Sequence, residues 1–172
     1  MRWCLTSILV LSLFASPAVA DDRPNFVIMV ADDLGYGDLG SYSHPVIRTP
    51  HIDRLADEGL RFTNGYAAAP VCTPARVGLL TGRISSRVGV YDWIPPGSDV
   101  HLPVKETTIA EILRDAGYET VYLGKWHLNG GLGLDDQPQP DDHGFDHWFA
   151  TTGFAMPTHL DPFNFSRNGV ET

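Results

Sequence analysis

Hydrophobic positions along the chain form strand-like runs and helix-like stripes. A continuous apolar run covers residues 25–31, and such runs are typical of strands buried on both faces of a parallel sheet. A second strand is expected over residues 118–123, directly after a helical pattern and a short turn. This order suits a βαβ unit, so the sequence predicts an α/β fold with a mostly parallel sheet.

The first predicted helix, over residues 50–58, has explicit start and stop signals. Thr49 suits the N-cap, Pro50 suits the first helical position, and Gly59 suits the position after the last turn. The apolar positions follow helical spacing and comprise Ile52, Leu55 and Ala56. We therefore expect an amphipathic surface helix.

A second helix is predicted from a capping box formed by Thr108 and Glu111, and Gly117 is expected to end it. Residues 84–106 contain a Pro-Pro-Gly sequence and a further proline, so we expect a connecting loop there. Residues 131–142 are rich in Gly, Asp and Pro, which predicts a mobile loop.

A third helical pattern places a reactive side chain at its start. Thr73 is expected to cap this helix, with Pro74 in its first position and Gly82 just past its end. Cys72 then lies beside free backbone N–H groups and the positive end of the helix dipole, which favour an anion. Arg76 lies one turn along and can turn its planar, charged guanidinium back towards Cys72.

Charged side chains follow the two predicted strands. Asp32 and Asp33 come directly after the apolar run, where open α/β sheets bind ligands. Two adjacent carboxylates favour a divalent cation with oxygen ligands, Ca²⁺ or Mg²⁺, although an Asp-rich turn is an equally good explanation. Lys125 and His127 follow the second strand and can supply a cation and a proton-transfer group. An exposed strand end is the plainer interpretation of these two residues alone.

The overall composition excludes one class of partner. The chain has 172 residues, 43% of them hydrophobic, and a formal net charge of −9. This length and composition suit one packed domain. An acidic chain without a cluster of Lys and Arg is a poor candidate for binding nucleic acid.

Residues 1–20 have the three regions of a signal peptide. Arg2 gives a positive start, an apolar core follows, and Ala18-Val19-Ala20 is a small-x-small cleavage site. The apolar core is too short to span a bilayer, so we expect export and no membrane anchor. The mature chain, residues 21–172, would then retain Cys72 as its one cysteine, which cannot form an intrachain disulfide.

Several separate segments together resemble one enzyme family. Cys-x-Pro-x-Arg from Cys72 to Arg76, followed by Leu-Thr-Gly-Arg at 80–83, resembles the signature of the type I sulfatases of the alkaline-phosphatase-like superfamily. Gly-Lys-Trp-His-Leu at 124–128 resembles their second signature, although Asn129 replaces the usual Gly. The Asp-Asp pair and the Thr-Pro-x-Ile-Asp-x-Leu-Ala segment at 49–56 also match. His-Gly-Phe-Asp at 143–146 is similar to a segment that leads into a strand, here 146–150.

The resemblance implies a fold, an activity and a set of site residues. The fold is a mostly parallel sheet sandwiched by helices, and the activity is hydrolysis of a sulfate ester to an alcohol and inorganic sulfate. In this family the cysteine, here Cys72, is oxidised to Cα-formylglycine by a formylglycine-generating enzyme, and the hydrated aldehyde attacks sulfur. Asp32, Asp33 and residue 72 would bind Ca²⁺. Arg76 and Lys125 would stabilise charge, and His127 would help to regenerate the aldehyde.

The resemblance leaves part of the site unaccounted for. The family completes its metal site with an Asp-Asn pair farther along and adds another His and Lys, and nothing after Gly131 matches. We therefore expect residues 21–172 to be the N-terminal portion of a longer catalytic domain. Depending on the host, the exported protein would be periplasmic, secreted or lysosomal.

Three alternatives remain open. A phosphonate monoester or phosphodiester hydrolase of the same superfamily can share Cys-x-Pro-x-Arg. A Cys/His thiol hydrolase would use the unmodified thiol. A truncated fragment without turnover is the third possibility.

Overall fold

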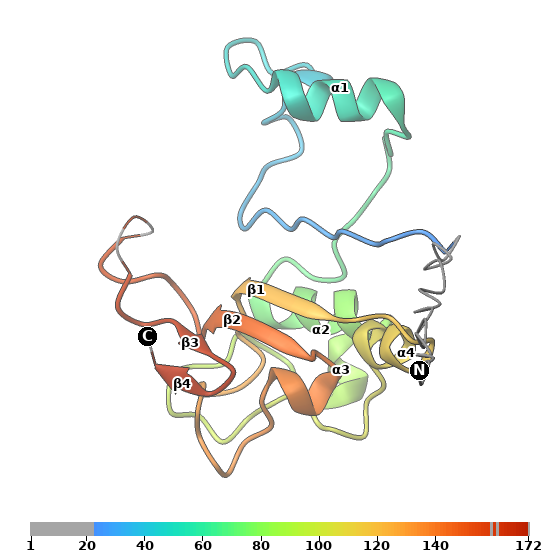
Figure 1. Cartoon of the computed structure of the whole chain (residues 1–172). Coiled ribbons are helices and arrows are strands. Elements are labelled where there is room, and N and C mark those ends of the chain that lie inside the picture. The colour runs from blue at the N-terminus through green and yellow to red at the C-terminus, as the bar shows by residue number, and fades with distance from the viewer. Residues whose placement is uncertain (1–22, 159, 161, 172) are drawn as a thin grey trace, which may run out of the picture. The chain divides into compact units, whose positions relative to one another are not determined.

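The computed structural model describes residues 23–158, 160 and 162–171. The predicted signal peptide lies outside these residues. The chain divides into two units, residues 1–34 and 35–172. The elements of the larger unit, labelled in Figure 1, are η1 (Gly40–Tyr42), α1 (Pro50–Glu58), α2 (Cys72–Thr81), α3 (Ser85–Val88), α4 (Ile109–Asp115), β1 (Val121–Lys125), η2 (Pro140–His143), β2 (His147–Thr151), β3 (Ser166–Arg167) and β4 (Val170–Glu171).

The four strands form one mixed sheet in the order β1-β2-β3-β4. β1 and β2 are parallel, with Val121 opposite His147 and Lys125 opposite Thr151. β3 and β4 continue the sheet with antiparallel pairings. Strands were predicted near residues 120 and 148, in a mostly parallel sheet, and both are present as the parallel pair β1 and β2. The first of them begins three positions later than expected, because the backbone of Tyr118 still donates to the carbonyl of Leu113 and closes helix α4.

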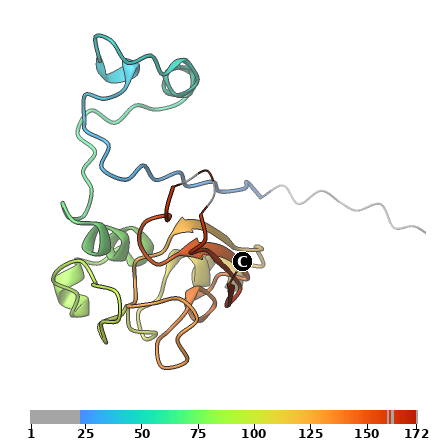
Figure 2. The ribbon, with the colours of Figure 1, turned by 90° about the vertical axis from the view of Figure 1, so that its left-hand side faces the viewer.

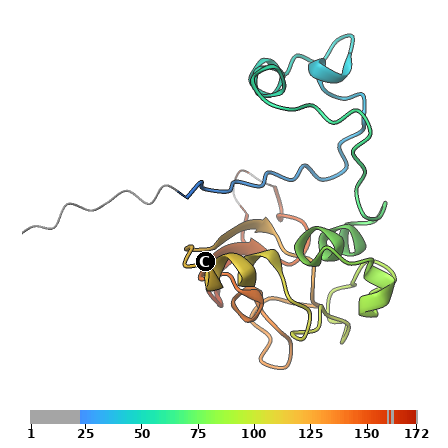
Figure 3. The ribbon, with the colours of Figure 1, turned by 90° about the vertical axis from the view of Figure 1, so that its right-hand side faces the viewer.

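Helices α2 and α3 lie on one side of this sheet (Figures 2 and 3). Trp126, which follows β1 and is fully buried, makes edge contacts with the rings of Tyr122 and Phe145 at 5.0 and 6.0 Å. On β1, Tyr122 packs against the core, while Leu123 is 72% exposed. Within residues 35–172, β1 therefore packs the face that carries Tyr122 against the core, while Leu123 on its other face is exposed.

The predicted buried strand over residues 25–31 is wrong for this structure. These residues have no strand assignment and all are exposed, with Val27 at 81% and Met29 at 79%. A buried strand needs a ladder partner and side-chain cover, and the pairings among the described residues involve β1 to β4 alone. The apolar pattern therefore identifies a segment suited to burial, although its side chains are exposed in this structure.

Two predicted helices match closely at their ends. α1 begins at Pro50 and ends before Gly59, as expected, and α4 has the predicted capping box between Thr108 and Glu111. The cap of α1 differs in detail. The Thr49 hydroxyl accepts the N–H of Gly40 at 2.8 Å and donates to the Asp53 carboxylate at 2.8 Å, so it joins α1 to η1.

Both predicted loops contain more structure than expected. Residues 84–106 include α3 and bury four apolar side chains, Val88, Val90, Ile94 and Leu102. Residues 131–142 are fixed by the side chain of Gln137, which accepts the N–H of Gly130 and donates to the carbonyl of Ser98, both at 2.7 Å. A high content of Pro and Gly indicates that a segment lacks long helices and strands. It does not indicate whether hydrogen bonds and buried side chains attach that segment to the rest of the fold.

Candidate functional site

Helix α2 begins at Cys72, whose side chain is half-buried and forms no disulfide. Its first backbone hydrogen bond runs from the N–H of Ala75 to the carbonyl of Val71, at 2.9 Å. Pro74 is in the first turn, where a helical N–H has no intrahelical partner, so its missing donor costs nothing. Gly82 takes the left-handed conformation and ends the helix, as predicted.

Thr73 does not cap α2, which corrects the prediction. The helix begins two residues earlier than predicted, with Val71 at the N-cap, and no side chain caps it. The Thr73 hydroxyl is fully buried, where it donates to the carbonyl of His127 at 2.9 Å and accepts the N–H of Ile94 at 3.2 Å. A buried hydroxyl needs partners, and Thr73 finds them on two distant segments.

Arg76 joins α2 to the end of β1. Its Nη1 donates to the carbonyl of Lys125 at 2.6 Å and to the Tyr122 hydroxyl at 3.1 Å. The Tyr122 hydroxyl also donates to the Lys125 carbonyl. Nη1 carries two N–H groups, so this one nitrogen can donate to both acceptors. The motif residue Arg76 is thereby held against the second motif.

Lys125 is the last residue of β1, opposite Thr151 of β2. Its Nζ lies 4.4 Å from the centroid of the Phe154 ring, which is within cation–π range. Backbone bonds from Arg76 and Tyr122 fix its carbonyl, and the aromatic ring supports its ammonium. The strand end therefore presents a positive charge at the edge of the sheet where ligands are expected.

His127 follows two residues later in a left-handed conformation, with φ of +55°. This is an uncommon conformation for a residue other than glycine, and the surrounding contacts must hold it. The side chain is buried, and its Nε2 lies 3.0 Å from the carbonyl oxygen of Ile94. Because a carbonyl can only accept, Nε2 carries a hydrogen and the neutral ring has its lone pair on Nδ1.

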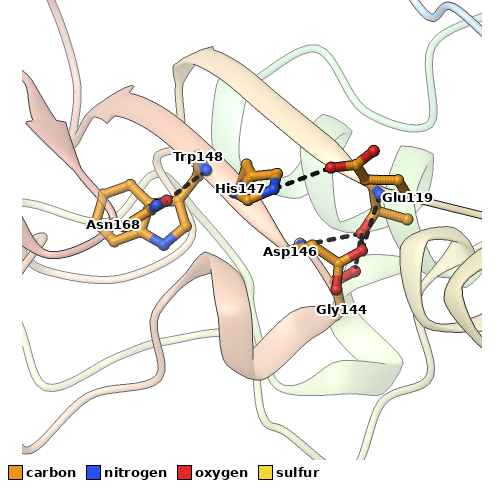
Figure 4. Close-up of polar contacts among 7 residues, drawn as sticks. Glu119, Gly144, Asp146, His147, Trp148 and Asn168 are labelled. Carbon is orange, nitrogen blue, oxygen red and sulfur yellow. Dashed lines mark hydrogen bonds and ion pairs between the residues drawn. The ribbon is translucent and has the colours of Figure 1, made fainter. Parts of the chain in front are cut away.

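The other end of the β1–β2 pair carries a polar cluster around Thr120, and Figure 4 labels Glu119, Gly144, Asp146 and His147 of this cluster. The backbone N–H and the hydroxyl of Thr120 both donate to Asp146 at 2.9 Å, and these two bonds lower the pKa of the Asp146 carboxyl. His147 pairs with Glu119 at 3.0 Å on the surface. The cluster aligns the starts of β1 and β2 and thus the position of Lys125 at the far end.

Asp32 and Asp33 lie in the smaller unit and are exposed, and Asp33 has a left-handed backbone with φ of +59°. Among the described residues, no three His, Cys, Asp or Glu side chains form a group that could hold a metal ion. The chemistry of the pair fits Ca²⁺, because carboxylate oxygens are its preferred ligands. Two carboxylates supply fewer than the about six to eight oxygens that Ca²⁺ takes, so further donors are required.

The structure thus brings Cys72 and Arg76 together, through α2, with the segment that carries Lys125 and His127. Sequence reasoning missed Thr73, Tyr122 and Ile94 as the residues that make this junction. The pattern around Thr73 pointed to a helix cap, and nothing in the sequence identified its partner, which lies 54 positions away. No helix of the described residues has the length and apolarity to cross a bilayer.

Comparison with known proteins gives a consistent result. The family model named Sulfatase matches residues 24–168. Arylsulfatase A of Bos taurus is 49% identical over 144 residues, which cover 83% of this chain and 27% of that protein. Steryl-sulfatase of Rattus norvegicus is 44% identical over 163 residues, covering 88% of this chain and 28% of that protein. The chain therefore spans about a quarter of the length of these curated relatives.

Solved structures agree with the sequence relatives. The sulfatase PsFucS1 from Pseudoalteromonas sp. is 35% identical, with a TM-score of 0.61 over 73% of this chain and 25% of that one. A protein described under the metabolism of multiple glycosaminoglycans by Bacteroides thetaiotaomicron is 39% identical, with a TM-score of 0.70 over 82% of this chain and 30% of that one.

Proposed function

The chain belongs to the sulfatase family, and from this premise we propose that the protein hydrolyses sulfate esters to an alcohol and inorganic sulfate. One observation of the structure supports the proposal most directly. Arg76 of the first motif donates to the backbone carbonyl of Lys125 in the second, so the two segments that carry the guanidinium, the ammonium and the imidazole are joined by a hydrogen bond. Two cationic side chains on joined segments suit a sulfate group.

The reactive group in this proposal derives from Cys72. Oxidation of its side chain to Cα-formylglycine by a formylglycine-generating enzyme replaces the thiol with an aldehyde, whose hydrate supplies a nucleophilic oxygen. The half-buried position of residue 72 at the first turn of α2 supports this role, because the free N–H groups there favour developing negative charge.

The metal of the proposal is Ca²⁺, and Asp32, Asp33 and the modified residue 72 are the residues that would hold it. The two carboxylates are hard oxygen donors, as the ion requires. When bound, the ion polarises the sulfate oxygens by its charge.

In this proposal, the side chains where α2 meets the end of β1 stabilise negative charge and transfer a proton. The Arg76 guanidinium and the Lys125 ammonium stabilise the negative oxygens of the sulfate as charge develops on them. His127 accepts a proton at Nδ1, because its Nε2 already donates to the carbonyl of Ile94. That proton transfer assists release of sulfate and return of the aldehyde.

The signal peptide is a separate proposal. Residues 1–20 would be removed after Ala20 on export, which would leave a mature protein that begins at Asp21. N-terminal sequencing of exported protein tests this directly, and an intact Met1 on exported material would contradict it.

The activity is best tested in a chimera in which this chain replaces the corresponding segment of human arylsulfatase A, to which it is 49% identical over 138 residues. Coexpression with a formylglycine-generating enzyme should give turnover of a chromogenic aryl sulfate and an aldehyde at residue 72 by mass spectrometry. Cys72→Ala should abolish both signals.

Two outcomes of this experiment would favour the alternatives. Hydrolysis of a phosphate diester but of no sulfate ester would indicate the phosphodiesterase activity. Sulfate turnover with only unmodified Cys72 in the active protein would indicate that formylglycine is not used, and full labelling of Cys72 by a thiol reagent would then support a thiol hydrolase.

A further inference from the structure

Three buried residues from three separate segments form a closed ring of hydrogen bonds beside the proposed site. Thr73 of α2 donates from its hydroxyl to the carbonyl of His127 at 2.9 Å. The backbone N–H of Ile94 donates to the same hydroxyl at 3.2 Å. The His127 Nε2 completes the ring by donating to the Ile94 carbonyl at 3.0 Å.

Burial makes each bond of this ring important. Thr73 and Ile94 have exposed fractions of 0% and 1%, and His127 has 5%. A polar group buried without a partner costs about 1–3 kcal/mol, so none of the three can readily exchange its partner for water. The ring also constrains His127 twice, once through its backbone carbonyl and once through its imidazole.

We propose that Thr73 is a positioning residue that holds His127 in its left-handed conformation and, through the backbone of Ile94, keeps the hydrogen of the imidazole on Nε2. Nδ1 is then the nitrogen left to accept a proton. The catalytic use of that proton transfer rests on the proposed function. The ring of hydrogen bonds can be tested without measuring any enzymatic activity.

The choice of Thr at position 73 follows from the two bonds that its hydroxyl makes. One oxygen must donate to one backbone group and accept from another, which a hydroxyl can do and a methyl group cannot. Valine has nearly the same shape but leaves both the Ile94 N–H and the His127 carbonyl without this partner. Serine keeps the oxygen and loses only a methyl group.

The test follows the imidazole N–H proton of His127 by NMR in the ¹⁵N-labelled chain. A hydrogen-bonded, buried imidazole N–H exchanges slowly with water and gives a visible resonance, whereas a solvated one exchanges too fast. We expect this resonance in the parent chain and in Thr73→Ser. In Thr73→Val its exchange should accelerate at least about tenfold, the factor that one buried hydrogen bond of ordinary strength supplies.

Thr81→Val is the matched control, because Thr81 lies on the same helix and its hydroxyl bonds only locally, to the carbonyl of Val77 at 2.6 Å and to the N–H of Arg83 at 3.2 Å. This variant should leave the His127 resonance unchanged. The non-exchanging ring C–H resonances of His147, which pairs with Glu119 on the surface, should be the same in all variants. A His127 exchange rate within twofold of the parent in folded Thr73→Val would overturn the proposal.

A second measurement keeps the proposal testable if Thr73→Val does not fold. The amide of Ile94 should exchange slowly in the parent chain and in Thr73→Ser, since its acceptor is the residue-73 hydroxyl. Fast exchange of this amide in the parent chain would overturn the ring. Failure of the chimera to hydrolyse sulfate esters would count against the proposed function alone and would leave both NMR results standing.

Discussion

Helices α1 and α2 have nearly equal length, nine and ten residues, but very different surroundings. α2 buries Thr73, Pro74, Val77 and Leu80, whereas no residue of α1 is buried and Leu55 on its apolar face is 59% exposed. Both helices end at a glycine and include a proline in the first turn. The comparison teaches that local signals determine where a helix forms, while burial depends on which other segments reach it.

The difference is also visible in how each helix is tied to the chain. α1 is joined to η1 through the Asp53 carboxylate, which accepts the N–H of Ser41 at 2.6 Å. α2 is joined to the end of β1 through Arg76 and Thr73, whose partners are about fifty positions away. Long-range bonds of this kind require a packed core, so α2 should be much more sensitive to substitution than α1.

The largest expected effect comes from placing a charge on the apolar side of each helix. Val77→Asp puts a carboxylate at a fully buried position and should lower the free energy of unfolding by roughly 4 kcal/mol or more. Leu55→Asp on α1 should cost less than about 1 kcal/mol. Urea unfolding of both variants measures the difference, and equal losses would contradict the comparison.

The next effect concerns turnover rather than stability. Arg76→Lys keeps the charge but loses the planar guanidinium, whose Nη1 reaches both Tyr122 and Lys125, and it should reduce sulfate-ester turnover by about 10²–10³-fold. Arg54→Lys on the exposed side of α1 is the control and should be neutral. The arylsulfatase A chimera, with equal formylglycine content in each variant, provides the assay. Parent-like turnover by Arg76→Lys would show that its geometry is unimportant.

The sequence was sufficient for features that depend on neighbouring residues. The ends of α1, the capping box of Thr108 and Glu111, and the left-handed Gly82 were all predicted correctly, because each involves groups within one or two helical turns. The motif spacing also predicted that α2 and the end of β1 would carry the candidate site. The hydrogen bond from Arg76 to the Lys125 carbonyl joins these two segments, and their role as a site stays a prediction.

The sequence was insufficient where the partner is distant. Judged from its neighbours in the sequence alone, Thr73 resembles a helix cap. Its hydroxyl instead bonds to the backbone of residues 94 and 127, which are distant in the sequence. The apolar run at 25–31 has the composition of a buried strand, but a ladder requires a neighbour, and composition does not provide one. The roles of Asp32, Asp33 and the other site residues stay predictions until the variants are assayed.

A smaller effect distinguishes the ion pairs of the two helices. Arg83, which follows α2, pairs with the carboxylate of Glu106, a residue only 4% exposed. Arg83→Ala leaves that buried carboxylate without its charged partner and should cost about 2 kcal/mol. Arg54 and Glu58 of α1 form an exposed pair at 3.7 Å, and Arg54→Ala should cost less than about 0.5 kcal/mol. Thermal unfolding of the two variants should rank them in this order.

The smallest expected effect is on the pH dependence of stability, and it differs between a buried histidine and an exposed one. His143 of η2 is buried against Trp126, at 5.7 Å between ring centroids, and this burial lowers its pKa despite the opposing charges of Glu111 and Asp142. Above pH 6.5, the ordinary pKa of histidine, the ring is neutral in the folded and the unfolded chain, so protonation does not affect folding. Below that pH the unfolded chain binds the proton more readily than the folded chain does.

Stability should therefore fall as the pH drops from about 6.5 towards the lowered folded-state pKa, with a contribution of at most about 1.4 kcal/mol per pH unit from this one group. His143→Gln should remove that part of the slope between pH 6.5 and 5, whereas His51→Gln, on the exposed surface of α1, should leave the slope unchanged. Urea unfolding at a series of pH values measures both slopes. An identical slope in the parent chain and in folded His143→Gln would show that burial of His143 does not couple protonation to folding, and the contrast between the two regions would then rest on packing alone.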